Sequence, residues 1–295
     1  MTGRAGRAAC GLAGLLVALA GCSRPSGTVV IGAKNFTESD LLAEILAQQI
    51  ERRTSLHVER RLHLGGTFVC HRALVAGDID AYVEYTGTAL VAILEQPPTA
   101  DAESALALVR AAYGQRFASE WLSPLGFNNT FAMIVRSSDA RRFGITTLSQ
   151  AASRARLWRA GFGYEFMRRP DGFAGLARAY GLTLAGSPRT MDLGLTYRAL
   201  ADSQVDLIAG NSTDGQIAAL DLVALADDRR YFPPYQAAPV VRSATLRRHP
   251  EVRRALEALA GRISEATMRR LNAAVDVEHR DLAAVAREWL DSQQR

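Results

Sequence analysis

The sequence predicts an α/β protein with room for two lobes, and three observations support this prediction. The chain has 295 residues, which is long for one small domain and comfortable for two α/β lobes. Hydrophobic residues make up 48% and charged residues 22%, a mixture that excludes a disordered chain, a coiled-coil rod and a collagen-like repeat. Short β-branched runs alternate with helical segments, so we expect mainly parallel sheets with ligand sites at the carboxyl ends of strands.

In the first half of the chain, strands and helices follow one another regularly. Residues 28–32 are a short β-branched run, which predicts a buried strand. A helix capped by Asn35 or Thr37 should follow and extend to about Arg53, because apolar residues recur on one side of it. The same reasoning predicts strands at 56–64 and 79–85, and helices at 67–76, from 86 onward and at 101–113.

The second half continues this alternation and ends in a helical tail. The predicted strands are 127–135, 157–163, 205–209, 222–225 and 240–241. The predicted helices are 146–155, 173–180 and 194–202, followed by a tail that is almost wholly helical over 250–293. Residues 164–172 are predicted to form a loop.

The amino-terminal segment predicts export and lipid attachment. Residues 1–21 combine a short positive region with an apolar run that is too short to span a bilayer, which is typical of a signal peptide. The run ends in Leu19-Ala20-Gly21-Cys22, which resembles the lipobox of bacterial lipoproteins, whose cysteine is lipidated. We therefore expect an extracytoplasmic or periplasmic protein anchored to a bacterial membrane through Cys22, with residues 22–27 as a tether. An ordinary secretory signal with an incidental cysteine is the alternative.

Cysteine, histidine and charge patterns exclude several classes of site. After signal removal and lipidation Cys70 stands alone, so no internal disulfide is expected, and its apolar surroundings predict a buried side chain. The histidines show no ligand spacing, so no metal is expected. The net charge is only +5 and basic pairs are scattered, so no nucleic-acid partner is expected.

The sequence also lacks the common catalytic motifs, so neither an enzyme nor a cofactor is expected. It has no GxSxG elbow, no HExxH, no P-loop and no CxxC. Instead, polar and aromatic residues gather where predicted strands end, in the stretches 35–38, 82–86, 128–131, 164–166, 197, 211–214 and 231–235. Such loops can build a binding cleft that has no nucleophile. The alternative is that these aromatics are ordinary core and turn residues.

Seven stretches carry a resemblance to a known family. They are IGAKNFTE, GDIDAYVEYTGTAL, PLGFNNTFAM, EFMRRPDGFAGL, MDLGLTYRAL, NSTDGQI and DDRRYFPPYQAAPVVR, spread in order from residue 31 to residue 242. With them the chain resembles the substrate-binding lipoproteins of osmoprotectant ABC importers, the glycine betaine/carnitine/choline group. The resemblance implies a two-lobed periplasmic-binding-protein fold with a hinge between the lobes. We place the crossings near Phe131–Met133 and Pro234–Pro239, so that lobe one is 28–131 with 238–295 and lobe two is 132–237.

The resemblance further implies a quaternary-amine or betaine-type ligand held by aromatic rings. Tyr85 and Tyr197 would give ring faces to the ligand's cation, with Phe131 as a third wall. Polar contacts, or the loops that hold them, would come from Asn35, Thr67, Asn128, Glu165, Asn211, Thr213 and Asp214. Phe131 and Asn211 stand where related proteins often carry tyrosine. This incomplete cage leaves open a weaker betaine binder or a different zwitterionic solute, such as an ergothioneine-like betaine.

The function implied by the resemblance is solute capture for transport. The protein would act as a monomer, bind an osmoprotectant in an interlobe cleft and deliver it to the permease and ATPase subunits of an ABC importer. Two alternatives remain open from the residues. One is an exported sensory binding protein for a related zwitterion, and the other is an exported enzyme of the same architecture.

Overall fold

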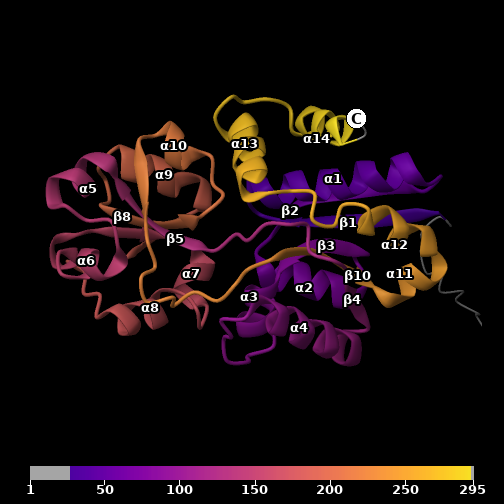
Figure 1. Cartoon of the computed structure of the whole chain (residues 1–295), viewed down its shortest axis with the longest axis horizontal. Coiled ribbons are helices and arrows are strands. Elements are labelled where there is room, and N and C mark those ends of the chain that lie inside the picture. The colour runs from indigo at the N-terminus through magenta and orange to yellow at the C-terminus, as the bar shows by residue number, and fades with distance from the viewer. Residues whose placement is uncertain (1–26, 294–295) are drawn as a thin grey trace, which may run out of the picture.

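The computed structural model describes residues 27–293 and has two α/β lobes, each built on one sheet (Figure 1). Here lobe one is the first sheet with its helices, and lobe two is the second sheet with its helices. The predicted α/β class and two-lobed architecture are confirmed. The predicted signal peptide and Cys22 lie outside the described residues.

The sheet of lobe one has the strand order β2-β1-β3-β10-β4. β1 pairs in parallel with β2 and β3, whereas β10 is antiparallel to β3 and β4. The strands are β1 (Thr28–Lys34), β2 (His57–Gly65), β3 (Ala81–Tyr85), β4 (Ser119–Trp121) and β10 (Ala237–Arg242).

Helices cover both faces of this sheet because side chains alternate along its buried strands. Val29 and Ile31 of β1 pack into a core with α1 (Thr37–Arg53) and the carboxyl-terminal helices, whereas Val30 packs against α2 (Thr67–Ala76) and α4 (Ala102–Phe117). Cys70 is buried in α2, as predicted, and burial raises its pKa to about 12. The remaining helices of this lobe are α3 (Thr86–Thr88), the π-helix Ala89–Ile93, α11 (Ser243–Arg248), α12 (Pro250–Glu257), α13 (Glu265–Asp276) and α14 (Leu282–Ser292).

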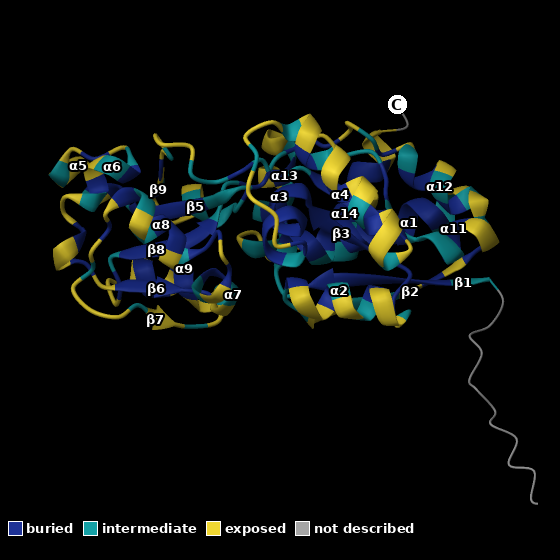
Figure 2. Cartoon of the chain, turned by 90° about the horizontal axis from the view of Figure 1, so that it is seen from below, coloured by how far each residue is buried: buried dark blue, intermediate teal, exposed yellow. Residues whose placement is uncertain are grey.

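The sheet of lobe two has the order β7-β6-β8-β5-β9 and is also covered on both faces (Figure 2). Its strands are β5 (Phe131–Arg136), β6 (Ala160–Phe162), β7 (Arg189–Thr190), β8 (Leu207–Asn211) and β9 (Leu222–Leu225). Its helices are α5 (Ser137–Phe143), α6 (Leu148–Ala152), the 3-10 turn Ala155–Leu157, α7 (Tyr164–Arg168), α8 (Phe173–Tyr180), α9 (Leu193–Ala201) and α10 (Gln216–Ala219).

The chain passes between the two sheets twice, once between β4 and β5 and once between β9 and β10 (Figure 1). Phe131, the first residue of β5, pairs with Asn211 in lobe two, and Ala237, the first residue of β10, pairs with Tyr85 in lobe one. An antiparallel bridge between Asn128 and Gln236 joins the two crossing segments. The lobe boundaries given above stay a prediction.

Two sequence-based expectations are wrong. The sheets are mixed rather than mainly parallel, because β5 and β10 enter their sheets from the opposite lobe and therefore run antiparallel to their neighbours. The segment 164–172 is not all loop, because Tyr164–Arg168 forms the one-turn helix α7. Gly163 begins this turn in an extended conformation, Glu165 favours its positive end, and Pro170 follows closely. The strand β4 and the helix α5 were not predicted.

Candidate functional site

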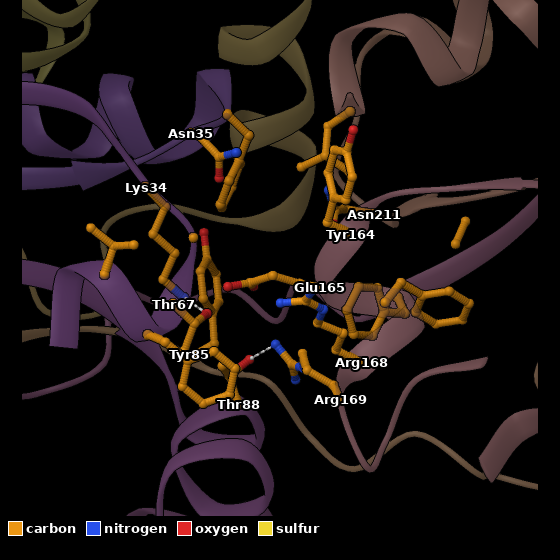
Figure 3. Close-up of a pocket in the computed structure, with 18 of the residues that line it drawn as sticks. Lys34, Asn35, Thr67, Tyr85, Thr88, Tyr164, Glu165, Arg168, Arg169 and Asn211 are labelled. Carbon is orange, nitrogen blue, oxygen red and sulfur yellow. Dashed lines mark hydrogen bonds between the residues drawn. The ribbon is translucent and has the colours of Figure 1, made fainter. Parts of the chain in front are cut away.

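A cavity of about 530 Å³ lies between the lobes (Figure 3). Lobe one contributes the ends of β1 and β3 and the start of α2, and lobe two contributes α7 and the end of β8. The lining residues are Lys34, Asn35, Phe36, Gly66, Thr67, Phe68, Val69, Arg72, Tyr85, Thr88, Asn129, Phe131, Tyr164, Glu165, Phe166, Arg168, Arg169, Asp192, Leu193, Ala209, Gly210, Asn211 and Tyr235.

The wall from lobe one is built on a buried ion pair. Lys34, at the end of β1, donates to Glu84 Oε1 over 2.5 Å and to Thr67 Oγ1 over 3.0 Å. Only 3% of Lys34 and none of Glu84 is exposed, so each charge depends on the other. The Lys34 ammonium lies 5.0 Å from the ring centroid of Tyr85. Parallel strands β1 and β3 bring these residues together, since their carboxyl ends meet at one edge of the sheet.

The wall from lobe two carries a second buried ion pair. Arg169 donates to Asp171 through Nε over 2.8 Å and through Nη2 over 2.5 Å. Its Nη1 donates to Thr88 Oγ1 over 3.1 Å, which is a hydrogen bond between the lobes (Figure 3). The guanidinium lies 4.9 Å from the ring centroid of Phe131 and 6.0 Å from that of Tyr235. Burial lowers the pKa of Arg169, but its bonds to Asp171 and the charge of that residue outweigh burial and raise the pKa overall.

Glu165 reaches across the cavity from lobe two to lobe one. Its carboxylate lies against Gly66, so closely that a Cβ at position 66 would overlap it. Gly66 immediately precedes α2, whose amino end carries partial positive charge and favours a nearby anion. The contact therefore exists only when the two lobes approach one another and position 66 has no side chain.

Behind the cavity, the carboxylate of Glu38 in α1 accepts hydrogen bonds from residues in four segments of the chain. Tyr85 and Asn129 donate to Oε1 over 2.6 and 2.8 Å. Thr213 and Asn272 donate to Oε2 over 2.5 and 2.9 Å. Burial raises the pKa of Glu38, and the four donors oppose this effect. Glu38 thus links β3, one crossing segment, lobe two and α13.

A smaller network holds the loop that follows β8. Asp214 accepts from the Tyr197 hydroxyl over 2.6 Å and from the Asn211 backbone N–H over 2.8 Å. Burial raises the pKa of Asp214 from its ordinary 3.8 to about 6, against the lowering effect of these bonds. Tyr197 lies behind Gly210, where a Cβ would overlap its hydroxyl, and packs in the core of lobe two.

The structure brings six of the predicted site residues to the cavity and leaves four outside it. The six lining residues are Asn35, Thr67, Tyr85, Phe131, Glu165 and Asn211. Of the others, Asn128 accepts from the Tyr235 backbone N–H over 2.5 Å in the crossing segments. The other three are Tyr197, Thr213 and Asp214, which belong to the two networks just described. These four support the cavity from behind.

Sequence reasoning did not predict the cationic part of this cavity. Lys34 directly precedes the predicted Asn35, and Arg168 and Arg169 lie within the segment that was expected to be a loop. Tyr235 also lines the cavity from the second crossing segment. One available signal was that Lys34, Arg168 and Arg169 all lie inside the stretches IGAKNFTE and EFMRRPDGFAGL.

The charges that line the cavity suit a ligand carrying both signs. The lining includes the cations Lys34, Arg72, Arg168 and Arg169 and the anions Glu165 and Asp192. Within residues 27–293, no group of three or more His, Cys, Asp or Glu side chains could hold a metal ion. None of the helices within these same residues is long and apolar enough to cross a membrane.

Comparison with known families gives a match over nearly the whole described chain. The sequence profile of the family described as the substrate binding domain of ABC-type glycine betaine transport systems matches residues 27–292. The carnitine transport binding protein OpuCC of Listeria monocytogenes is 36% identical over 280 residues, covering 92% of this chain and 91% of that protein. The glycine-betaine-binding protein of Pseudomonas aeruginosa is 35% identical, covering 89% of this chain and 87% of that protein.

Two further similarities extend the comparison. The ergothioneine transport permease/ergothioneine binding protein EgtU of Helicobacter pylori is 34% identical over 89% of this chain, which corresponds to 47% of that longer protein. A crystal structure titled as a glycine betaine/carnitine/choline ABC transporter superposes with a TM-score of 0.75 at 33% identity, covering 90% of this chain and 98% of that one.

Proposed function

Because the chain belongs to the family of substrate-binding domains of ABC-type glycine betaine transport systems, we propose that its interlobe cavity captures a betaine-type solute for an importer. The observation that carries this proposal is a cavity whose walls come from both lobes and carry both signs of charge. The related proteins are named for carnitine, glycine betaine and ergothioneine, which are all zwitterions with a quaternary ammonium group. These three solutes are the first candidates.

Capture would proceed by closure of the lobes around the solute. A ligand shifts a conformational equilibrium only if it binds one state better, so it must touch both lobes to favour the closed state. Thr67 and Tyr85 from lobe one, and Glu165 and Asn211 from lobe two, line the cavity and offer such contacts. Lobe one would be 28–131 with 238–295, lobe two would be 132–237, and the paired crossing segments would form the hinge.

The predicted site residues fall into two roles in this proposal. Those that line the cavity would contact the solute directly, with Glu165 facing its ammonium group. Asn128, Tyr197, Thr213 and Asp214 would act as positioning residues, because they fix the crossing segments and the loop after β8. Substituting these residues should alter the positions of the cavity-lining side chains without removing a group that contacts the solute.

The cellular setting of the proposal follows from the amino-terminal segment and the family. The protein would be exported, lipidated at Cys22 and tethered outside the cytoplasmic membrane by residues 22–27. There it would act as a monomer and deliver solute to the permease, which the ATPase subunits drive. Delivery rather than chemical turnover is the proposed role, so bound solute should be recovered unchanged.

A thermal-shift screen with calorimetry tests the proposal. A ligand present at a hundred times its Kd stabilises the native state by about 2.7 kcal/mol, which should raise Tm by about 5 °C or more. Glycine betaine, carnitine and ergothioneine are the expected hits, with amino acids and sugars as negative controls. Glu165→Ala should weaken binding, whereas Glu103→Ala, an exposed acid on α4, should not. No shift with any of the three betaines contradicts the proposal.

A further inference from the structure

Glu38 is a buried carboxylate that pairs with no cation of the described chain. Only 2% of the residue is exposed. Its hydrogen-bond donors are all neutral, and they are Tyr85, Asn129, Thr213 and Asn272. Glu44 of the same helix shows the contrast, because it is also buried but Arg60 donates to it over 3.0 Å. An ionised carboxylate without a cation is costly to bury, so the site of Glu38 favours a neutral carboxyl group.

The charges around Glu38 do not supply the missing cation. The titratable and charged groups that surround the amino end of α1 are Lys34, Asp40, His63, Glu84, Tyr85, Tyr197, Asp214, Arg269, Asp276 and His279. Lys34 donates to Glu84, and Arg269 donates to the Ser212 carbonyl. Asp214 adds a second carboxylate from lobe two, and two negative charges brought together disfavour the ionised form of each.

Two amide oxygens beside Glu38 lack a hydrogen-bond donor. Asn129 and Asn272 donate to Glu38 through Nδ2, but the Oδ1 atom of each is buried and accepts from no described residue. The two residues are only 7% and 1% exposed. An ionised carboxylate can only accept, whereas a protonated one also donates. If either amide turns over, its Oδ1 faces Glu38, so the protonated carboxyl group has an acceptor within the same network.

This carboxylate lies where the two lobes meet. Thr213, which donates to it over 2.5 Å, belongs to the loop after β8 in lobe two. Gly215 of the same loop lies so close to α13 of lobe one that a Cβ at position 215 would overlap the backbone of Ala273. Separation of the lobes would replace these contacts with water, which stabilises an ionised carboxylate. Approach of the lobes therefore removes hydration from Glu38.

The inference rests on the proposed function, in which the lobes close around the solute. We propose that Glu38 takes up a proton from solvent when the lobes close, so that solute capture is coupled to protonation. Glu38 is a positioning residue in this scheme, because it does not line the cavity but holds Tyr85, which does. Closure raises the pKa of Glu38, so affinity should rise as the pH falls. The rise is at most about tenfold per pH unit for one whole proton.

Calorimetry in buffers of different ionisation enthalpy counts the protons that are taken up on binding. Glycine betaine and carnitine are titrated into the purified protein at about pH 5 and about pH 7, and their quaternary ammonium groups cannot titrate. We expect proton uptake with both solutes, larger at the lower pH. Binding with an enthalpy that does not depend on the buffer, or with proton release, would overturn the inference and leave the proposed function intact. If neither solute binds, the proposed function is contradicted, and the inference with it.

Glu38→Gln assigns the proton to this residue. Glutamine keeps one oxygen for the donors and presents an amide N–H to the unpartnered Asn129 and Asn272 oxygens, so it resembles the protonated acid. This variant should bind glycine betaine but lose most of the proton uptake. Glu44→Gln is the matched control, since this buried acid of α1 pairs with a cation, and it should keep the parental uptake. If Glu38→Gln does not fold, the buffer comparison on the parent protein still decides whether closure takes up a proton.

Asp214→Asn separates the two neighbouring acids. The Asp214 carboxylate is held by Tyr197 and by the Asn211 backbone within lobe two, so its partners do not depend on closure. Proton uptake should therefore persist in this variant. Uptake that is lost in Asp214→Asn and kept in Glu38→Gln would assign the proton to Asp214 and would overturn the inference.

Discussion

Thr213 of lobe two donates a hydrogen bond of 2.5 Å to the carboxylate of Glu38 in lobe one. The same carboxylate holds Tyr85, which lines the cavity, and Asn272 of α13, which also donates to the Thr213 carbonyl over 2.9 Å. The loop after β8 is therefore fixed to lobe one and to the carboxyl-terminal helices. Neither Glu38 nor Thr213 lines the cavity, but the hydrogen bond between them fixes the cavity walls of the two lobes relative to one another.

Thr213→Val should loosen this connection and weaken solute binding. The variant removes one bond to a buried carboxylate, so we expect the free energy of unfolding to fall by about 1–3 kcal/mol. Affinity should fall as well, because the closed arrangement loses one of its interlobe bonds. Thr37→Val is the matched control, since Thr37 donates to Asp276 within lobe one. Urea unfolding and calorimetry check both, and equal loss of affinity in both variants would contradict the interlobe role.

The raised pKa of Asp214 predicts a defined pH dependence of stability. Its pKa is about 6 in the folded protein and 3.8 ordinarily, so the folded state binds more protons between these values. The free energy of unfolding therefore falls as the pH rises through this window. Asp214→Asn removes the titrating group. The free energy of unfolding of the variant should therefore rise relative to that of the parent as the pH increases from about 4 to about 6. The urea unfolding midpoints of the parent and the variant, measured at several pH values, test this prediction. A difference between the two midpoints that does not change with pH would contradict it.

Gly66→Ala should impair closure without unfolding the protein. The new methyl group would overlap the Glu165 carboxylate, which approaches only when the lobes come together. We expect weaker solute binding with little change in Tm, because position 66 precedes α2 and is only partly buried. Glu165→Ala should relieve the overlap, so adding Gly66→Ala to that variant should cost little further affinity. Strictly additive effects of the two substitutions would argue against this contact in solution.

Cys22→Ser tests the proposed anchoring. Without the thiol no lipid can be attached, so the protein should move from the membrane fraction to the soluble extracytoplasmic fraction. Solute binding should be unchanged, because the described cavity begins at Lys34. Cell fractionation with immunoblotting measures the distribution. Retention of the variant in the membrane fraction at the parental level would mean that Cys22 is not the anchor.

The sequence was sufficient to predict most elements and part of the site. Periodicity predicted α2 over 67–76 and β9 over 222–225 with the bounds that the structure has. The residues at strand ends also lie together, because Asn35 follows β1 and Tyr85 ends β3, and these parallel neighbours end at one edge of the sheet. These features depend on local pattern and on a general property of parallel sheets.

What could not be predicted depends on contacts between distant segments. Tyr197 was expected to face the ligand, yet the absence of a side chain at Gly210 lets it pack behind the cavity wall. The sequence pattern assigns Lys34 no role, and only the fold places it beside Glu84 and beneath the ring of Tyr85. The antiparallel direction of β5 likewise follows from the crossing between lobes, which local periodicity does not encode.

Small-angle X-ray scattering of the purified protein, with and without a saturating betaine from the screen, tests the central claim most directly. If the two lobes close on a solute held between them, the radius of gyration should fall on binding. The change should be absent with a sugar that gives no thermal shift. An identical profile before and after calorimetrically verified binding would contradict capture by lobe closure.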